Sequence, residues 1–162
     1  MAKTEFEPIG VIHTPFKSPV DVPIQPTGGR DVEAVVEVDP RYVPGLEDLD
    51  GFSHILLVYH FHLSKGYKLK VVPFADTEER GLFSTRAPRR PNPIGVSVVR
   101  LLRIEGNKIH ISDIDMVDGT PLLDIKPCVP HLYPSPDDVK IGWLEGKVNG
   151  MGRLRADKRF SE

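Results

Sequence analysis

The sequence predicts a mainly β protein: a single closed or partly closed barrel of about seven or more short strands, with few short helical turns. Sixteen prolines and fourteen glycines among 162 residues interrupt the apolar runs before they reach helix length. The runs that remain are rich in Val and Ile, and Pro, Gly, Asn or Asp separates them. We expect a barrel because closure removes the exposed edges that many short strands would otherwise present.

Seven apolar runs are the expected strands, in chain order 8–16, 32–38, 53–61, 68–74, 95–104, 108–117 and 121–127. The tetrapeptide Glu-Gly-Asn-Lys at 105–108 separates two of these runs, and Gly and Asn favour tight turns. We therefore expect a β-hairpin that pairs residues 96–104 with residues 109–117. No amphipathic helix of three turns is expected anywhere in the chain.

One domain is expected, because 162 residues with 40% hydrophobic content suit a single core. The domain is predicted to cover residues 1–150. Residues 151–162 carry Arg153, Arg155, Lys158 and Arg159 and are predicted to form a basic, mobile tail.

The charge and cysteine content exclude several classes of protein. A net charge of −2 excludes a uniformly basic coat for nucleic acid. The single cysteine, Cys128, excludes an internal disulfide. Because neither a signal-peptide core nor an apolar run of 18 residues occurs, we expect a cytoplasmic location and no membrane partner.

The segment "GLFSTRAPRRPNPIGVSVVRL" (81–101) is the least ordinary part of the sequence. Six arginines and no acidic residue lie between positions 80 and 103. Proline fixes φ and restricts the residue before it, so Arg86, Arg89, Arg90 and Asn92 lie on a stiff piece of chain. Arginine binds carboxylate or phosphate through paired donors, so we expect an anionic partner, either a small carboxylated ligand or RNA. The alternative is a solvated loop that protects a sheet edge.

The segment "DIDMVDGTPLLDIKP" (113–127) places carboxylates within a strand, turn and strand pattern. A carboxylate on a short strand is costly unless it is solvated, paired or used. We therefore expect a functional role for at least one of Asp115, Asp118 and Lys126. The alternative for Asp118 is simple turn chemistry, because Asp-Gly-Thr-Pro is a good turn sequence.

Histidine and cysteine give weaker signals. His60 and His62 could share one side of a strand, but two imidazoles without a carboxylate are a poor zinc site, so no metal is expected. A metal-dependent hydrolase using this pair remains one alternative. We expect His62 at the rim of a ligand pocket, and Cys128 as a small apolar group rather than a nucleophile paired with His131.

Five blocks resemble the TsaA/TrmO-like family, and the region that they span, from residue 9 to about residue 130, is about three quarters of the chain. The blocks are "IGVIHTPF" (9–16), "VPIQP" (22–26), "GFSHI" (51–55), "GLFSTRAPRRPNPIG" (81–95) and "DIDMVDGTPLLDIKP" (113–127). The resemblance implies a methyltransferase that uses S-adenosylmethionine, is built on a single β-barrel and forms homodimers. It implies methylation of N6 of threonylcarbamoyladenosine beside the anticodon of tRNA, at position 37.

The resemblance also implies where the ligands bind. The residues expected to bind the cofactor are Pro26, Thr27, Gly28, His62, Leu63, Arg86, Ile114 and Asp115. Arg89, Arg90 and Lys126 are expected to bind the substrate, with the two arginines and the basic tail on the anticodon arm. Asn92 is expected to bond the modified base, and either Asp118 or Asp115 to act as general base.

A second class of function stays open. The barrel could be retained in an RNA-binding or S-adenosylmethionine-sensing module that performs no catalysis. Such a module would tolerate the loss of Asp118, whereas an enzyme that uses this carboxylate as base would not.

Overall fold

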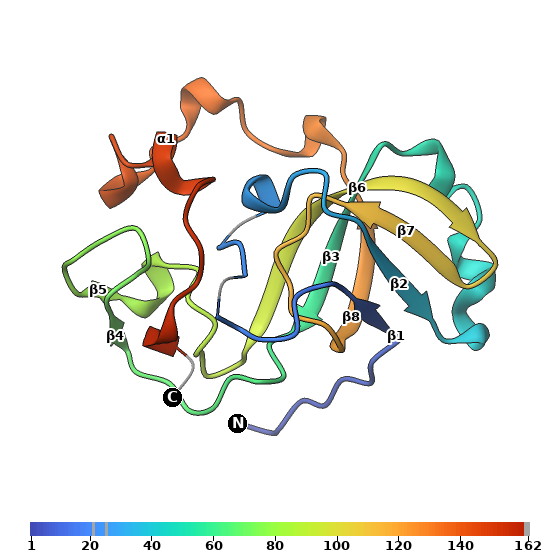
Figure 1. Cartoon of the computed structure of the whole chain (residues 1–162), viewed down its shortest axis with the longest axis horizontal. Coiled ribbons are helices and arrows are strands. Elements are labelled where there is room, and N and C mark those ends of the chain that lie inside the picture. Colours follow the sequence, from blue (N-terminus) through green and yellow to red (C-terminus); the bar gives the residue numbers. More distant parts are fainter. Residues whose placement is uncertain (21, 25, 161–162) are drawn as a thin grey trace.

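Six antiparallel strands close a barrel in the order β1-β2-β7-β6-β3-β8 (Figure 1). The structure is a computed structural model that describes residues 1–20, 22–24 and 26–160. The expected mainly β fold with a closed barrel is confirmed, and its six strands come close to the predicted number. The barrel strands are β1 (Gly10–His13), β2 (Ala34–Val38), β3 (His54–His60), β6 (Ile94–Glu105), β7 (Lys108–Ser112) and β8 (Thr120–Pro127).

The run at 68–74 does not become a barrel strand. Only β4 (Lys70–Val71) forms there, and it pairs with β5 (Arg80–Gly81) in a separate two-stranded sheet. Pro73 follows two residues later, and a proline lacks the donor that a longer ladder would need. β4 and β5 lie beside the barrel rather than in its wall (Figure 1).

The helices are short, as expected. Eight are 3₁₀ turns and one is a single α-turn, among the residues that the structure describes. They are η1 (Pro26–Gly29), η2 (Pro40–Leu46), η3 (Leu49–Gly51), η4 (Leu82–Ser84), η5 (Pro130–Leu132), η6 (Pro136–Asp138), η7 (Gly142–Leu144), α1 (Val148–Met151) and η8 (Lys158–Phe160).

Strand alternation fills the barrel. In β3 the odd positions Ile55, Leu57 and Tyr59 are buried, whereas the even positions are more exposed. Such a period of two places one set of side chains inside and the other outside. His54 and His60 therefore lie on the outer set, at the two ends of β3.

The predicted hairpin is confirmed, although its second strand is shorter than expected. β6 pairs with β7 around a turn in which Gly106 has φ 61°, and Glu105 lies opposite Lys108. β7 ends at Ser112 and not at 117, because Asp113 takes a left-handed conformation with φ 63° that breaks the extended backbone. Residues 113–117 follow as an irregular segment.

The C-terminal segment (residues 142–160) lies against β4, β5 and the loop before η1. In Figure 1 its red end runs beside the green β4–β5 sheet. The Ala156 amide donates to the Val22 carbonyl at 2.7 Å, and the rings of Phe160 and Phe74 meet edge to face at 5.0 Å. The mobility of residues 151–162 stays a prediction, and residues 161–162 lie outside the described residues. In the part of the chain that is described, no helix has the length and hydropathy needed to cross a membrane.

Candidate functional site

A pocket of about 470 Å³ opens between one end of the barrel and the C-terminal segment. Its lining comes from β3, β6, the irregular segment after β7, the loop after β5 and the C-terminal segment. A volume of this size falls within the roughly 300–1,000 Å³ of small-molecule sites. Most of the wall is apolar, and the polar groups are few, as such sites require.

Asp115 and Tyr59 line the floor of the pocket, and the buried Ser97 links them in a chain of hydrogen bonds. The Ser97 hydroxyl donates to Oδ1 of Asp115 at 2.7 Å, and the Tyr59 hydroxyl lies 3.0 Å from the same serine oxygen. A serine has one hydroxyl proton, so Tyr59 must donate to Ser97. The ring of Tyr59 packs against Gly95, where a Cβ would lie 2.2 Å from the ring. Gly95 therefore fixes the tyrosine at the end of this chain.

Asp115 is the ionisable group at the floor. Burial raises the pKa of its carboxyl to about 6, and the Ser97 hydrogen bond and the positive charge of Arg86 only partly oppose this shift. Burial also raises the pKa of Tyr59, so its phenol stays protonated as a donor. A carboxyl that titrates near pH 6 inside a pocket is suited to holding a cation or accepting a proton.

Arg86 and His62 stand on the walls of the same pocket. The Arg86 guanidinium donates from Nη2 to the Val96 carbonyl, which anchors this exposed side chain on β6. Burial, followed by the neighbouring His60, lowers the pKa of His62, so its imidazole is neutral at pH 7. The walls thus offer one fixed cation and one neutral imidazole.

Several residues that the sequence predicted for the cofactor meet here. Five predicted site residues line the pocket: His62, Leu63, Arg86, Arg90 and Asp115. Thr27 and Gly28 lie in η1. This turn packs closely on the segment that carries Ile114: a Cβ on Gly29 would lie only 1.7 Å from the Ile114 carbonyl oxygen. Ile114 itself is fully buried in the core. Pro26 begins η1.

Arg90 lines the pocket but uses its guanidinium within its own loop. Its Nη1 donates to the carbonyls of Thr85 at 2.9 Å, Ala87 at 3.3 Å and Leu82 at 3.4 Å. These contacts hold the loop after β5 in one shape. Its predicted contact with substrate stays a prediction.

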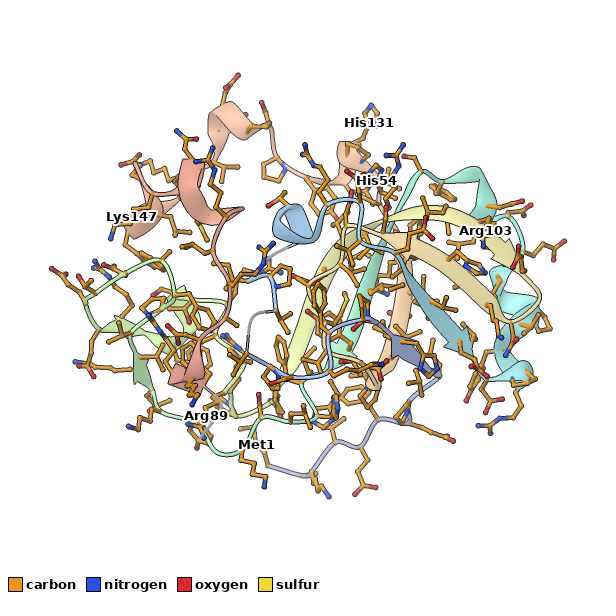
Figure 2. The ribbon with its side chains drawn as sticks, viewed as in Figure 1. Met1, His54, Arg89, Arg103, His131 and Lys147 are labelled. Atoms are coloured by element: carbon orange, nitrogen blue, oxygen red, sulfur yellow. The ribbon has the colours of Figure 1, made fainter. Side chains whose placement is uncertain are left out.

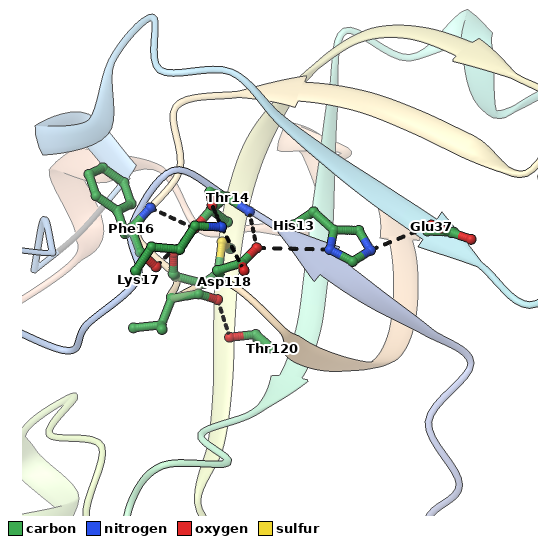
Figure 3. Close-up of polar contacts among 9 residues, drawn as sticks. His13, Thr14, Phe16, Lys17, Glu37, Asp118 and Thr120 are labelled. Carbon is green, nitrogen blue, oxygen red and sulfur yellow. Dashed lines mark hydrogen bonds and ion pairs between the residues drawn. The ribbon is translucent and has the colours of Figure 1, made fainter.

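Asp118 lies outside the large pocket, in a cluster of polar residues shown in Figure 3. It accepts from Lys17 Nζ at 2.7 Å and from the Thr14 amide at 2.9 Å, and His13 lies 3.8 Å away. The Lys17 hydrogen bond and then the Thr14 amide lower the pKa of this carboxyl. The general-base role predicted for Asp118 stays a prediction, but its proton affinity is low.

The other predicted substrate residues also lie outside the pocket lining. Asn92 is exposed, and its carbonyl accepts from the Ile94 amide at 2.8 Å. Arg89 has a buried Nε that lacks a hydrogen-bond partner among the described residues. Lys126 is exposed at the end of β8 and forms an ion pair with Asp124 at 2.7 Å. Their roles stay predictions.

The remaining histidine and cysteine signals do not form a cluster. Within residues 1–20, 22–24 and 26–160, no three His, Cys, Asp or Glu side chains are placed to hold a metal ion. Cys128 is a free, partly exposed thiol directly after β8. His62 lies at the wall of the pocket, and its predicted contact with a ligand stays a prediction.

Sequence reasoning missed Ser97, Tyr59 and the whole C-terminal wall. A signal for Ser97 was present, since it is a polar residue at an inward position of an apolar strand. The C-terminal segment had no periodic pattern, yet Trp143, Leu144, Met151, Ala156 and Phe160 all line the pocket.

An ion-pair latch, formed by Asp76, Arg80 and Lys147, holds this wall in place. The Asp76 side chain is 5% exposed, and it pairs with Arg80 Nη2 at 2.7 Å and Lys147 Nζ at 2.9 Å. Lys147, then Arg80, lower the pKa of the Asp76 carboxyl. In Figure 2, Lys147 lies at one end of the molecule, and Arg103 of the β6–β7 hairpin lies at the opposite end. Both cations of the latch lie over the Trp143 ring, whose Nε1 donates to the Ser84 carbonyl at 2.8 Å.

Comparison with known proteins gives consistent matches. Residues 11–133 match the family described as the tRNA-methyltransferase O N-terminal domain. A protein of Pyrococcus abyssi named as a probable S-adenosyl-L-methionine-binding protein is 53% identical over 155 residues, 96% of this chain and 84% of that protein. The tRNA (adenine(37)-N6)-methyltransferase of Mus musculus is 35% identical over 160 residues, 93% of this chain and 35% of that protein.

A solved structure is similar over the same region. The crystal structure of TrmO from Pseudomonas aeruginosa superposes with a TM-score of 0.73 at 35% identity, covering 88% of this chain and 63% of that chain. The present chain thus spans less than two thirds of the solved one. The residues of the C-terminal wall follow the region that the family domain matches.

Loss of the Lys147 charge should loosen the C-terminal wall. In Lys147→Met the apolar stem remains, but the ion pair with Asp76 is lost, so hydrogen exchange across residues 142–160 should rise about two- to fivefold. Exchange in the barrel strands should not change. Lys140→Met, on an exposed lysine of the preceding loop, is the matched control and should exchange like wild type. Identical exchange in Lys147→Met and wild type would show that the ion pair does not hold the segment.

Proposed function

The chain belongs to the tRNA-methyltransferase O family, and on this premise we propose that it methylates N6 of threonylcarbamoyladenosine at position 37 of tRNA, using S-adenosylmethionine. The observation that carries the proposal is the pocket with the Asp115 carboxyl at its floor and Arg86 on its wall. Each of these side chains has a charge opposite to one that the cofactor carries.

The residues of the pocket fit the cofactor chemically. S-adenosylmethionine supplies an activated methyl group on a positively charged sulfonium when it is bound. The Arg86 guanidinium keeps donors beyond the one bound to Val96, so it can bind a carboxylate. Phe61, Met116 and Phe160 provide apolar surface for a flat heterocycle. The relative in Pyrococcus abyssi, whose name describes S-adenosylmethionine binding, supports this assignment.

Asp115 is the residue of this chain with the most direct role in the proposed reaction. Its ionised carboxylate can balance a positive charge in the pocket, and it can also accept the proton that the attacking nitrogen releases. The Ser97 hydroxyl and the Tyr59 phenol behind it hold the carboxylate in one orientation.

The proposed nucleic-acid partner is the anticodon arm of tRNA. Position 37 adjoins the anticodon, and two arginines of the loop after β5, Arg86 and Arg90, line the pocket that would receive the base. We assign the threonyl carboxylate or a phosphate to Arg89, because a planar guanidinium binds either group through paired donors. A tRNA-modifying enzyme of this kind is also expected to work in the cytoplasm.

A homodimer is part of the proposal. The outer side of β6 exposes a row of apolar residues, Ile94 at 38% and Val96 and Val98 at 37% each. Contiguous exposed apolar surface marks interaction sites. Because Ile94 and Val96 also line the pocket, a second copy on this row would complete its rim. Sedimentation equilibrium should give about twice the chain mass of 18.1 kDa, and a monomeric mass would exclude the dimer.

The rate of methyl transfer should depend on the ionisation of Asp115. The folded pKa of about 6 means that kcat/KM should rise with pH up to about 6 and level off above about 7. Asp115→Asn should remove this rise and lower the rate by about 10²–10⁴-fold if the carboxylate is the base. Asp50→Asn, which changes an exposed carboxylate outside the pocket, is the control. A profile that stays flat between pH 5 and 7 in wild type would contradict the role.

The raised pKa of Asp115 also makes the stability of the fold depend on pH, in the absence of any substrate. Because the folded pKa of Asp115 lies above the ordinary carboxyl value, the folded state binds the proton more tightly than the unfolded state. The contribution of Asp115 to stability is therefore present below the ordinary pKa of about 3.9 and is lost as pH rises through about 6. Asp115→Asn should consequently melt at or above the wild-type temperature at pH 8.

A methyl-transfer assay tests the proposed function directly. The protein is incubated with labelled S-adenosylmethionine and two tRNA preparations, one carrying threonylcarbamoyladenosine and one lacking it, and the label is located by nuclease digestion and mass spectrometry. Label on the modified nucleoside alone is expected. Label on unmodified adenosine would show that threonylcarbamoyladenosine is not the required substrate, but it would still support methyltransferase activity. Absence of label, with the cofactor still raising the melting temperature, would favour the non-catalytic S-adenosylmethionine-binding module.

A further inference from the structure

Phe83 presents an aromatic ring to solvent at the edge of the pocket. Its residue is 74% exposed, whereas its neighbour Leu82 is 1% exposed and anchors η4 in a small core. The next three residues, Ser84, Thr85 and Arg86, all line the pocket. The exposed ring therefore lies beside the entrance for the base that the proposed function places in this pocket.

Arg90 lies against the same ring. The centre of its guanidinium is 5.7 Å from the ring centroid, within the range of a cation–π contact. Three carbonyl contacts, to Leu82, Thr85 and Ala87, fix this guanidinium from behind. The cation therefore stays at one side of Phe83 and supports the orientation of the ring.

The loop that carries the ring is rigid on both sides. The Thr85 hydroxyl donates to the Leu82 carbonyl at 2.8 Å and accepts from the Ala87 amide at 3.3 Å. The Trp143 indole donates to the Ser84 carbonyl, next to Phe83. An aromatic ring on a fixed loop loses little entropy when a flat ligand stacks on it.

We propose that Phe83, supported by Arg90, is a stacking site for an unpaired nucleobase next to the target adenosine. The inference rests on the proposed function, which brings the anticodon loop to this pocket. Proteins read single-stranded RNA loops by stacking unpaired bases on aromatic rings, while cations contact the backbone. Arg89, on the same loop, supplies a cation for that backbone.

The tested ligand is an anticodon stem-loop that carries threonylcarbamoyladenosine at position 37 and the fluorescent base 2-aminopurine at position 36 or 38. Stacking quenches 2-aminopurine, so emission from one of the two labelled positions should fall when the wild-type protein binds. Phe83→Leu should abolish this quenching and weaken binding roughly 5- to 150-fold. Phe83→Tyr, which keeps the ring, should retain most of both effects.

Three controls keep the test specific. Phe83→Leu should melt like wild type, because the ring is exposed. Its affinity for S-adenosylmethionine, measured without RNA, should also be unchanged, because Phe83 does not line the pocket. Phe6→Leu removes another exposed ring, 68% exposed in the N-terminal segment, and should bind the stem-loop like wild type.

The outcomes separate this inference from the proposed function. Wild-type quenching and affinity in Phe83→Leu would overturn the stacking site, and so would a loss of cofactor affinity, since the ring would then serve the cofactor. Quenching that depends on Phe83 in a protein that transfers no methyl group would support the stacking site and overturn the proposed catalysis.

Discussion

The left-handed turn at Asp113 determines where the ionisable group of the pocket lies. A φ of 63° in a residue other than glycine costs roughly 1–3 kcal/mol, and a hydrogen bond from the Asp31 amide to Oδ1 of Asp113, at 3.0 Å, offsets part of that cost. The turn ends β7 and directs the chain across the end of the barrel. Ile114 and Met116 pack in the barrel core, 0% and 2% exposed, and Asp115 between them lines the pocket together with Met116.

The other end of this segment is fixed by polar contacts rather than by packing. The Thr14 hydroxyl donates to the Met116 carbonyl at 3.0 Å, and the Thr14 amide donates to Asp118. The Lys17 ammonium forms an ion pair with the same carboxylate. The two aspartates singled out in the sequence therefore experience opposite environments. Burial raises the pKa of Asp115, whereas donors and a cation lower that of Asp118, and only the first group keeps an appreciable proton affinity near neutral pH.

Local patterns predicted the barrel well, because strand alternation and turn residues act through neighbours in the chain. The hairpin around Gly106 is an example, since a residue with positive φ is a local requirement. The end of β7 was not predictable, because the Asp113 turn is stabilised by Asp31, which lies 82 residues away. The C-terminal wall was missed for a similar reason: Trp143 and Lys147 are positioned by Ser84 and Asp76, and no periodic pattern encodes such contacts.

The arginines of the arginine-proline segment have different surroundings in the structure. Arg90 donates to three carbonyls of its own loop and lies over the Phe83 ring. Arg86 donates to one carbonyl, that of Val96, and lines the pocket. Sequence alone cannot separate these tasks, since each arginine carries the same charge and similar flanking prolines. The different contacts of Arg86 and Arg90 matter physically, because a loop that positions one arginine at a pocket needs a second interaction to fix its own backbone. Arg90 supplies that interaction from within the motif, so the stiffness of the loop comes from both proline and arginine.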